Sequence, residues 1–200
     1  MIRQDAISKI LLALAIAGTI YLATYSTTTV VIFPAILLLG GLGMEILLER
    51  HKHPEGEEAN EKHIDWKQIA YYSLISLMAM LLIGFAIQYI PLAGAGFDSL
   101  IYTAIIGISE EQFFRGFITD SLLSVKMPLV NTVLNPYLAL MASAAVFTVY
   151  HNARYGSNAD AMLYVFFGGF ILSWVAYKSR RLSPSMIGHA LNNIASALGV

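Results

Sequence analysis

The chain of 200 residues is 57% hydrophobic and only 12% charged, and its mean hydropathy is +0.65. Soluble domains carry about 25% charged residues, so this composition excludes an ordinary soluble domain and predicts an integral membrane protein. A net charge of -1 provides no basic surface for nucleic acid, and no nucleic-acid partner is expected. Because the sequence has no cysteine, any catalysis must use oxygen or imidazole groups.

Seven apolar stretches follow one another along the chain, each close to the length of a membrane-spanning helix. They lie near residues 8–25, 29–48, 68–90, 99–123, 134–152, 160–178 and 184–200. The sequence therefore predicts an all-α fold, a polytopic transmembrane helical bundle of about seven spans within a range of six to eight. We expect residues 1–200 to form a single integral membrane domain in contact with the lipid bilayer, and the first helix to be retained.

One substantial polar segment, Glu49 to Lys67, carries six acidic and four basic residues and predicts a solvated loop near 49–67. Basic residues also precede the first span and follow the sixth, at Lys178, Arg180 and Arg181. The positive-inside rule therefore places the loop and the N-terminus in the cytoplasm, in a protein of the cell membrane.

Glu110, Glu111 and Arg115 are charged residues in the interior of the fourth predicted span. A charge at the centre of a membrane helix costs roughly 2.5–3.5 kcal/mol, so these residues require an explanation. Glu111 and Arg115 are one helical turn apart, which predicts an internal ion pair. Glu110 points about 100° away from Glu111 and has no basic partner on its own helix. We therefore expect Glu110 to meet a partner from another span, or to be protonated.

Two histidines lie in predicted spans, His151 in the fifth and His189 in the seventh. His189 shares a helix face with Asn193, one turn later. Taken separately, His151 can be an interfacial histidine, and the His189–Asn193 pair can be hydrogen-bonding contacts between helices. Together with Glu110, however, they place on three spans the residue types that deprotonate water, bind an oxyanion or hold a metal.

The positions of these residues along their spans differ. His151 is near the end of its span, whereas Glu110 and His189 are near the middle of theirs, a difference in depth of about 10 Å at 1.5 Å per residue. Either the fifth span extends past Tyr155, or the other helices are tilted or broken near the site.

Three short patterns connect these residues: EExxxR at 110–115, FxxxH at 147–151 and HxxxN at 189–193. Their order and their places on successive apolar helices resemble the CPBP or Abi family of intramembrane proteases, which includes the Ras-converting CAAX prenyl endopeptidases. The patterns fall within a motif-bearing core near 99–200.

The resemblance implies an intramembrane endopeptidase that acts on a membrane-associated peptide or protein, which in relatives is lipidated. It also implies a role for each motif residue: water activation by Glu110 and His151, oxyanion stabilisation by His189 and Asn193, and support by Glu111 and Arg115. Elementary chemistry agrees, since a carboxylate without a cationic partner can accept and return a proton, whereas a paired carboxylate cannot readily do so.

Two other classes of protein share these features. One is a catalytically silent member of the same fold, acting as a membrane binding or immunity protein; the other is an ion- or proton-coupled transporter, because intramembrane Glu and His also mark ion paths. The intact Glu-His-His-Asn set favours the enzyme. The lack of paired broken helices in matching halves weighs against the transporter.

The sequence permits one cofactor, zinc. Glu110, His151 and His189 offer three ligands for a catalytic zinc at about 2.0–2.2 Å, with water in the fourth position. Zinc sites on a helix commonly use two histidines at i and i+4 beside a glutamate, and no predicted helix here carries two histidines. We therefore favour a mechanism without a cofactor, in which Glu110 and His151 activate water directly.

Overall fold

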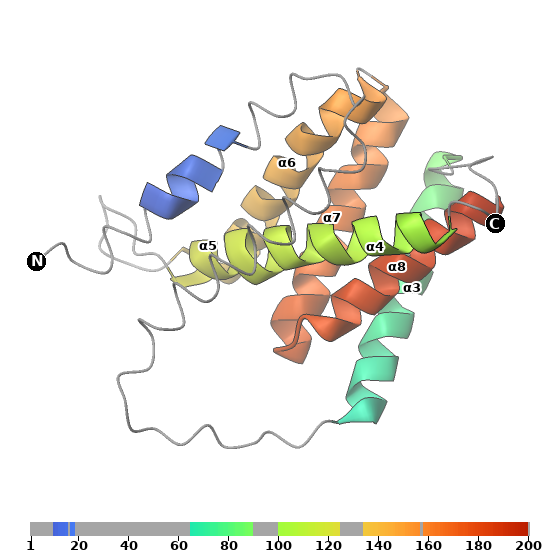
Figure 1. Cartoon of the computed structure of the whole chain (residues 1–200), viewed down its shortest axis with the longest axis horizontal. Coiled ribbons are helices and arrows are strands. Elements are labelled where there is room, and N and C mark those ends of the chain that lie inside the picture. Colours follow the sequence, from blue (N-terminus) through green and yellow to red (C-terminus); the bar gives the residue numbers. More distant parts are fainter. Residues whose placement is uncertain are drawn as a thin grey trace, which may run out of the picture.

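The computed structural model describes residues 10–15, 17–18, 65–89, 100–124, 134–156 and 158–199. Regular structure in these ranges is helical, which confirms the all-α prediction. The named elements are α3 (Trp66–Ile87), α4 (Leu100–Glu111), the π-helix η2 (Gln112–Thr119), α5 (Asp120–Ser124), α6 (Pro136–Tyr155), α7 (Ala159–Ser179) and α8 (Ser183–Leu198) (Figure 1). Residues 10–15 and 17–18 are also helical. The rest of the first predicted span, all of the second and most of the polar loop lie outside the described residues.

Polar residues at the edges of the apolar stretches set the ends of these helices. Asp65, Asn135 and Asn158 each accept a hydrogen bond from a backbone N–H in the first turn of α3, α6 and α7, respectively. Such caps satisfy donors that have no partner within the helix. At the other ends, Gln88 (φ 57°) and Arg180 (φ 54°) terminate α3 and α7 in the left-handed conformation. The predicted boundaries of these spans are therefore correct to within a few residues.

Helices α3 and α7 are, among the described residues, the two that are long and apolar enough to cross a membrane. The 22 residues of α3 extend about 33 Å at 1.5 Å per residue, compared with about 30 Å for a hydrocarbon core. Helix α8 has 16 residues and is about 24 Å long by the same rise. Membrane-length helices are therefore present, and the total of seven spans stays a prediction.

The described helices pack against one another in pairs. Helix α3 packs against α7 and α8, α6 packs against α7, and α4 packs against α8. Figure 1 shows α4 lying across α6 and α7 instead of running alongside them. Helix α6 ends at Tyr155 and does not extend past it, which leaves the expectation that the other helices are tilted or broken near the site. The change from α to π geometry directly after Glu111 is such a break.

The helix that follows Glu110 and Glu111 changes at once from α to π geometry. Within this π-helix, Phe114, Phe117 and Ile118 are fully buried, and they form an apolar cluster with Leu12 and Ala15 from the N-terminal helix. The sequence did not predict this change. The Thr119 hydroxyl donates to the carbonyl of Phe114 at 2.9 Å, five residues earlier, and Ser143 of α6 contacts the same two groups. These hydroxyls support the wide turn, a feature that often occurs at functional sites.

Two glycines hold α8 close to its neighbours on opposite sides. A Cβ atom at Gly107 of α4 would lie 3.3 Å from the Ala190 nitrogen and 3.4 Å from the carbonyl carbon of His189. A Cβ atom at Gly188 would overlap the Ser76 hydroxyl of α3. Because both contacts flank His189, they fix its position along the bundle.

Candidate active site

The three sequence motifs meet at Glu110. Its Oε1 atom lies 3.8 Å from Nε2 of His151, and its Oε2 atom lies 3.6 Å from Nε2 of His189. The three side chains come from α4, α6 and α8 and are 5%, 12% and 8% exposed, respectively. Glu110 therefore meets partners from two other helices, as the absence of a partner on its own helix led us to expect.

The hydrogen bonds of the two histidines determine which ring nitrogen faces Glu110. His151 Nδ1 lies 2.9 Å from the carbonyl oxygen of Phe147, which can only accept a hydrogen bond. His189 Nδ1 lies 2.8 Å from Glu111 Oε1, also an acceptor when ionised. Each Nδ1 therefore carries a proton, and in the neutral form of each ring Nε2 presents a lone pair to the Glu110 carboxylate.

Glu111 and Arg115 form the predicted ion pair, with 3.0 Å between Glu111 Oε1 and Arg115 Nη1 and both side chains fully buried. Arg115 Nη1 forms no hydrogen bond with the described residues, so its contact with Glu111 is an ion pair without a hydrogen bond. The Arg115 guanidinium also lies 4.3 Å above the ring of Phe147 and donates from Nη2 to the Gly169 carbonyl at 3.0 Å. The contact between Glu111 and His189 was not predicted from the sequence, because it joins residues 78 positions apart.

Asn193 lies on the same face of α8 as His189 but contacts an earlier turn of α4. Its amide nitrogen donates to the Thr103 carbonyl at 3.0 Å. The same nitrogen would lie 3.1 Å from a Cβ atom at Gly107, so the amide is about one helical turn from Glu110. The structure therefore brings Glu110, His151 and His189 together. One N–H of the Asn193 amide donates to the backbone, and its second N–H is available to another acceptor.

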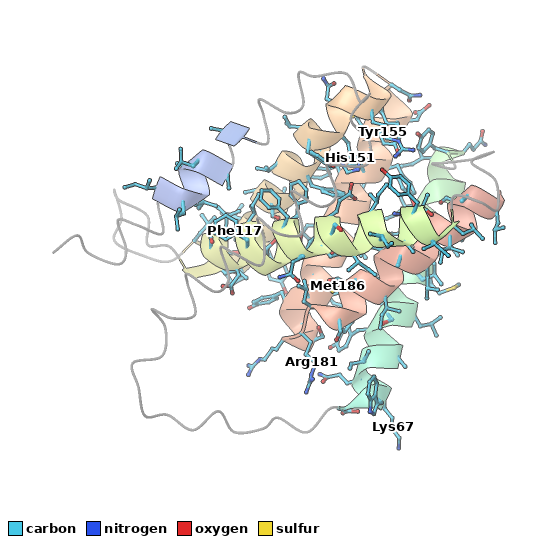
Figure 2. The ribbon with its side chains drawn as sticks, in the orientation of Figure 1. Lys67, Phe117, His151, Tyr155, Arg181 and Met186 are labelled. Carbon is cyan, nitrogen blue, oxygen red and sulfur yellow. The ribbon has the colours of Figure 1, made fainter. Side chains whose placement is uncertain are left out.

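Sequence reasoning missed Tyr150, the residue before His151. Its hydroxyl forms a hydrogen bond with Glu110, and its ring packs edge-on against His151 with 4.9 Å between ring centroids. Tyr155, one turn after His151 on α6, stacks on the imidazole with 5.9 Å between ring centroids (Figure 2). The signal in the sequence that could have identified them was a pair of tyrosines on either side of a histidine within six residues.

The described residues include no group of three or more His, Cys, Asp or Glu side chains arranged to hold a metal ion. The histidines face different oxygens of Glu110, at distances of 3.6 and 3.8 Å. Separations of this size are compatible with ligands that share a zinc ion as well as with groups that share a water molecule. Zinc therefore stays a prediction, and the proposed mechanism uses water alone.

Comparison with known families identifies the chain. Residues 92–195 match the family model described as type II CAAX prenyl endopeptidase Rce1-like. The chain belongs to this family. The match covers just over half of the 200 residues and includes all three motifs, which confirms the resemblance inferred from them. No curated protein and no solved structure gives a significant match. The family consists of membrane-embedded proteases, so a protease-type activity on a membrane-associated peptide or protein follows in general terms.

Proposed function

We propose that this protein is an intramembrane endopeptidase of the glutamate type, which hydrolyses a peptide bond of a membrane-associated substrate. The observation that supports the proposal is the convergence of Glu110 and the two Nε2 atoms. In the neutral form of both rings, two Nε2 acceptors lie 3.6 and 3.8 Å from the oxygens of Glu110, too far for direct hydrogen bonds. A water molecule suits such a site because it supplies two donors.

In the proposed first step, Glu110 and His151 activate this water. Its protons point to the carboxylate and to the His151 Nε2 atom, so an oxygen lone pair is free to attack a substrate carbonyl carbon. The new C–O bond forms as Glu110 takes one proton, and the carbonyl oxygen becomes an oxyanion.

His189 is suited to stabilise that oxyanion. Glu111 accepts a hydrogen bond from Nδ1 of His189, which fixes the ring orientation. It also balances the charge when Nε2 takes the proton from Glu110, a step in which the 3.6 Å between the two groups closes to hydrogen-bond distance. The protonated Nε2 can then donate to the oxyanion, and the second N–H of Asn193 can do the same. Collapse of the intermediate breaks the C–N bond, and the amine leaves with a proton from the site.

For the membrane, we propose a single domain of seven spans in the cell membrane with a cytoplasmic N-terminus. Lys67 at the start of α3 and Arg181 after α7 lie at the same end of the bundle, away from Tyr155 (Figure 2). Basic residues at one end match the positive-inside rule. A Cys introduced at Gly56, in a protein with no other cysteine, should be protected from an impermeant reagent added outside intact cells. Labelling from outside alone would reverse the proposed orientation.

The decisive experiment is cleavage of peptides by the purified protein in detergent. Because the family description names CAAX prenyl substrates, the library should contain farnesylated and unmodified peptides in matched pairs. We expect mass spectrometry to detect cleaved products with the wild type and none with Glu110→Gln. A wild-type protein that cuts none of them would favour the silent membrane binding protein.

Metal dependence requires its own test. We expect full activity in protein stripped of metal by a chelator, since Glu110 and His151 act directly on water. Stoichiometric zinc in the purified protein, with activity lost on chelation and restored by zinc, would contradict the metal-free mechanism.

A further inference from the structure

Helix α7 contains none of the three motifs, yet one of its residues touches the site. Gly169 lies opposite Arg115 and Phe147, and its carbonyl accepts hydrogen bonds from Arg115 Nη2 at 3.0 Å and from the Ser173 hydroxyl at 2.9 Å. We propose that Gly169 is a positioning residue, which holds Arg115 and Phe147 where both histidines face Glu110. This inference rests on the proposed function.

The first contact of Gly169 is with the guanidinium of Arg115. Its Nε and Nη1 atoms form no hydrogen bond with the described residues, so the bond to Gly169 is the directional contact that orients the guanidinium. The guanidinium contacts Glu111 at 3.0 Å, and Glu111 in turn accepts from His189. The Gly169 carbonyl therefore acts on His189 through two intermediate side chains.

The second contact of Gly169 is with Phe147, whose ring borders the space that a side chain at position 169 would fill. A Cβ atom there would lie 2.9 Å from Phe147 Cδ1 and 3.4 Å from Arg115 Nη2. The ring has little room to move, because it is buried between Arg115 and His151, with 4.3 Å between the Phe147 and His151 ring centroids. The Phe147 carbonyl also accepts from His151 Nδ1. A methyl group at position 169 would therefore disturb both histidines.

The adjacent glycine provides a matched control. A Cβ atom at Gly168 would lie 3.8 Å from Cγ and Sδ of Met80 on α3, an ordinary van der Waals distance. Gly168→Ala and Gly169→Ala change the same helix in the same way and gain the same helix propensity. They differ in the contacts that the added methyl group makes.

The first measurement is steady-state cleavage of a peptide that the wild type hydrolyses. We expect Gly169→Ala to lower kcat by on the order of 100-fold with little change in KM, because small displacements of reacting groups are costly. Gly168→Ala should stay within about twofold of the wild type, since its methyl group is accommodated. Equal activity in the two variants would overturn the proposal.

A double-mutant cycle separates positioning from general destabilisation. In a Phe147→Leu background the ring that opposes the methyl group is gone, so Gly169→Ala should cause much less additional loss than it does in the wild type. The same loss in both backgrounds would show that Gly169 does not act through Phe147. If Gly169→Ala alone fails to fold, a double variant that folds and cleaves as well as Phe147→Leu supports the proposal, and a double variant that also fails to fold overturns it.

A chemical readout tests the same idea without hydrolysis. Diethyl pyrocarbonate modifies accessible histidines, and mass spectrometry can locate the modification at His151 and His189. We expect faster modification of both residues in Gly169→Ala than in Gly168→Ala. Unchanged rates in both variants would overturn the proposal, whether or not the protein cleaves any peptide.

Discussion

The pair of helices α3 and α7 differs sharply from the pair α4 and α8. The first two are long and apolar, with ionisable residues such as Lys67, Asp160 and Lys178 near their ends. The second two are shorter and bury Glu110, Glu111 and His189. Apolar packing suffices to place the first pair in a bilayer, whereas the second pair depends on satisfied charges and close glycine contacts. Two of the three helices that supply the candidate site are therefore the shorter ones, and α3 and α7 both pack against α8.

The largest expected effect of a single change is on the reactive carboxylate. Glu110→Gln keeps the shape of the side chain but cannot accept a proton, so we expect hydrolysis to fall by about 100- to 10,000-fold, the usual contribution of general acid–base catalysis. The thermal melting temperature in detergent should change little. Unfolding of this variant would instead make Glu110 part of the structural framework.

Glu111→Gln should affect stability as well as activity. Arg115 would become a buried cation without its counter-charge, a change that costs about 3–5 kcal/mol in soluble proteins. The new amide could also donate to His189 Nδ1 and favour the wrong tautomer, which would lower activity. Lower yield and a lower melting temperature than Glu110→Gln are the expected signs. Equal stability of the two variants would contradict the distinction between the neighbouring glutamates.

A smaller effect is expected at Tyr150. Tyr150→Phe keeps the ring packed against His151 and removes the hydroxyl that bonds to Glu110. We expect kcat to fall by about tenfold or somewhat more, because a hydrogen bond to a charged group contributes about 1.5–3 kcal/mol. Tyr137→Phe, at the exposed start of the same helix, is the control and should leave kcat unchanged. Similar kcat values for both variants would remove Tyr150 from the site.

The smallest effect is expected in the apolar pair. Ser76 is buried on α3 and donates to the Ser73 carbonyl within its own helix. Ser76→Ala should change the free energy of unfolding by no more than about 1 kcal/mol and leave kcat unaltered, because the close approach of α8 to α3 depends on the missing side chain at Gly188 and not on the Ser76 hydroxyl. A loss of activity as large as that of Tyr150→Phe would show that α3 does more than pack against α8.

Sequence patterns predicted the parts of the structure that depend on local composition. Hydropathy located α3 and α7 to within a few residues, and the i, i+4 spacing correctly paired Glu111 with Arg115. The π geometry of 112–119 could not be predicted in this way, because it changes neither hydropathy nor the order of residues. The contact between Glu111 and His189 also escaped prediction, since it depends on the angle at which α4 crosses α8.

The two histidines of the site differ in how easily mutation can change them. His151 takes its tautomer from a backbone carbonyl, which every residue at position 147 would provide. The tautomer of His189 is set by a side chain, so a single substitution at Glu111 can remove the hydrogen bond that sets it. Inactive descendants of this protein should therefore arise more readily by losses on the α4–α8 side, where one codon controls the orientation of a proton. The α6 side should keep its histidine geometry through much greater sequence drift.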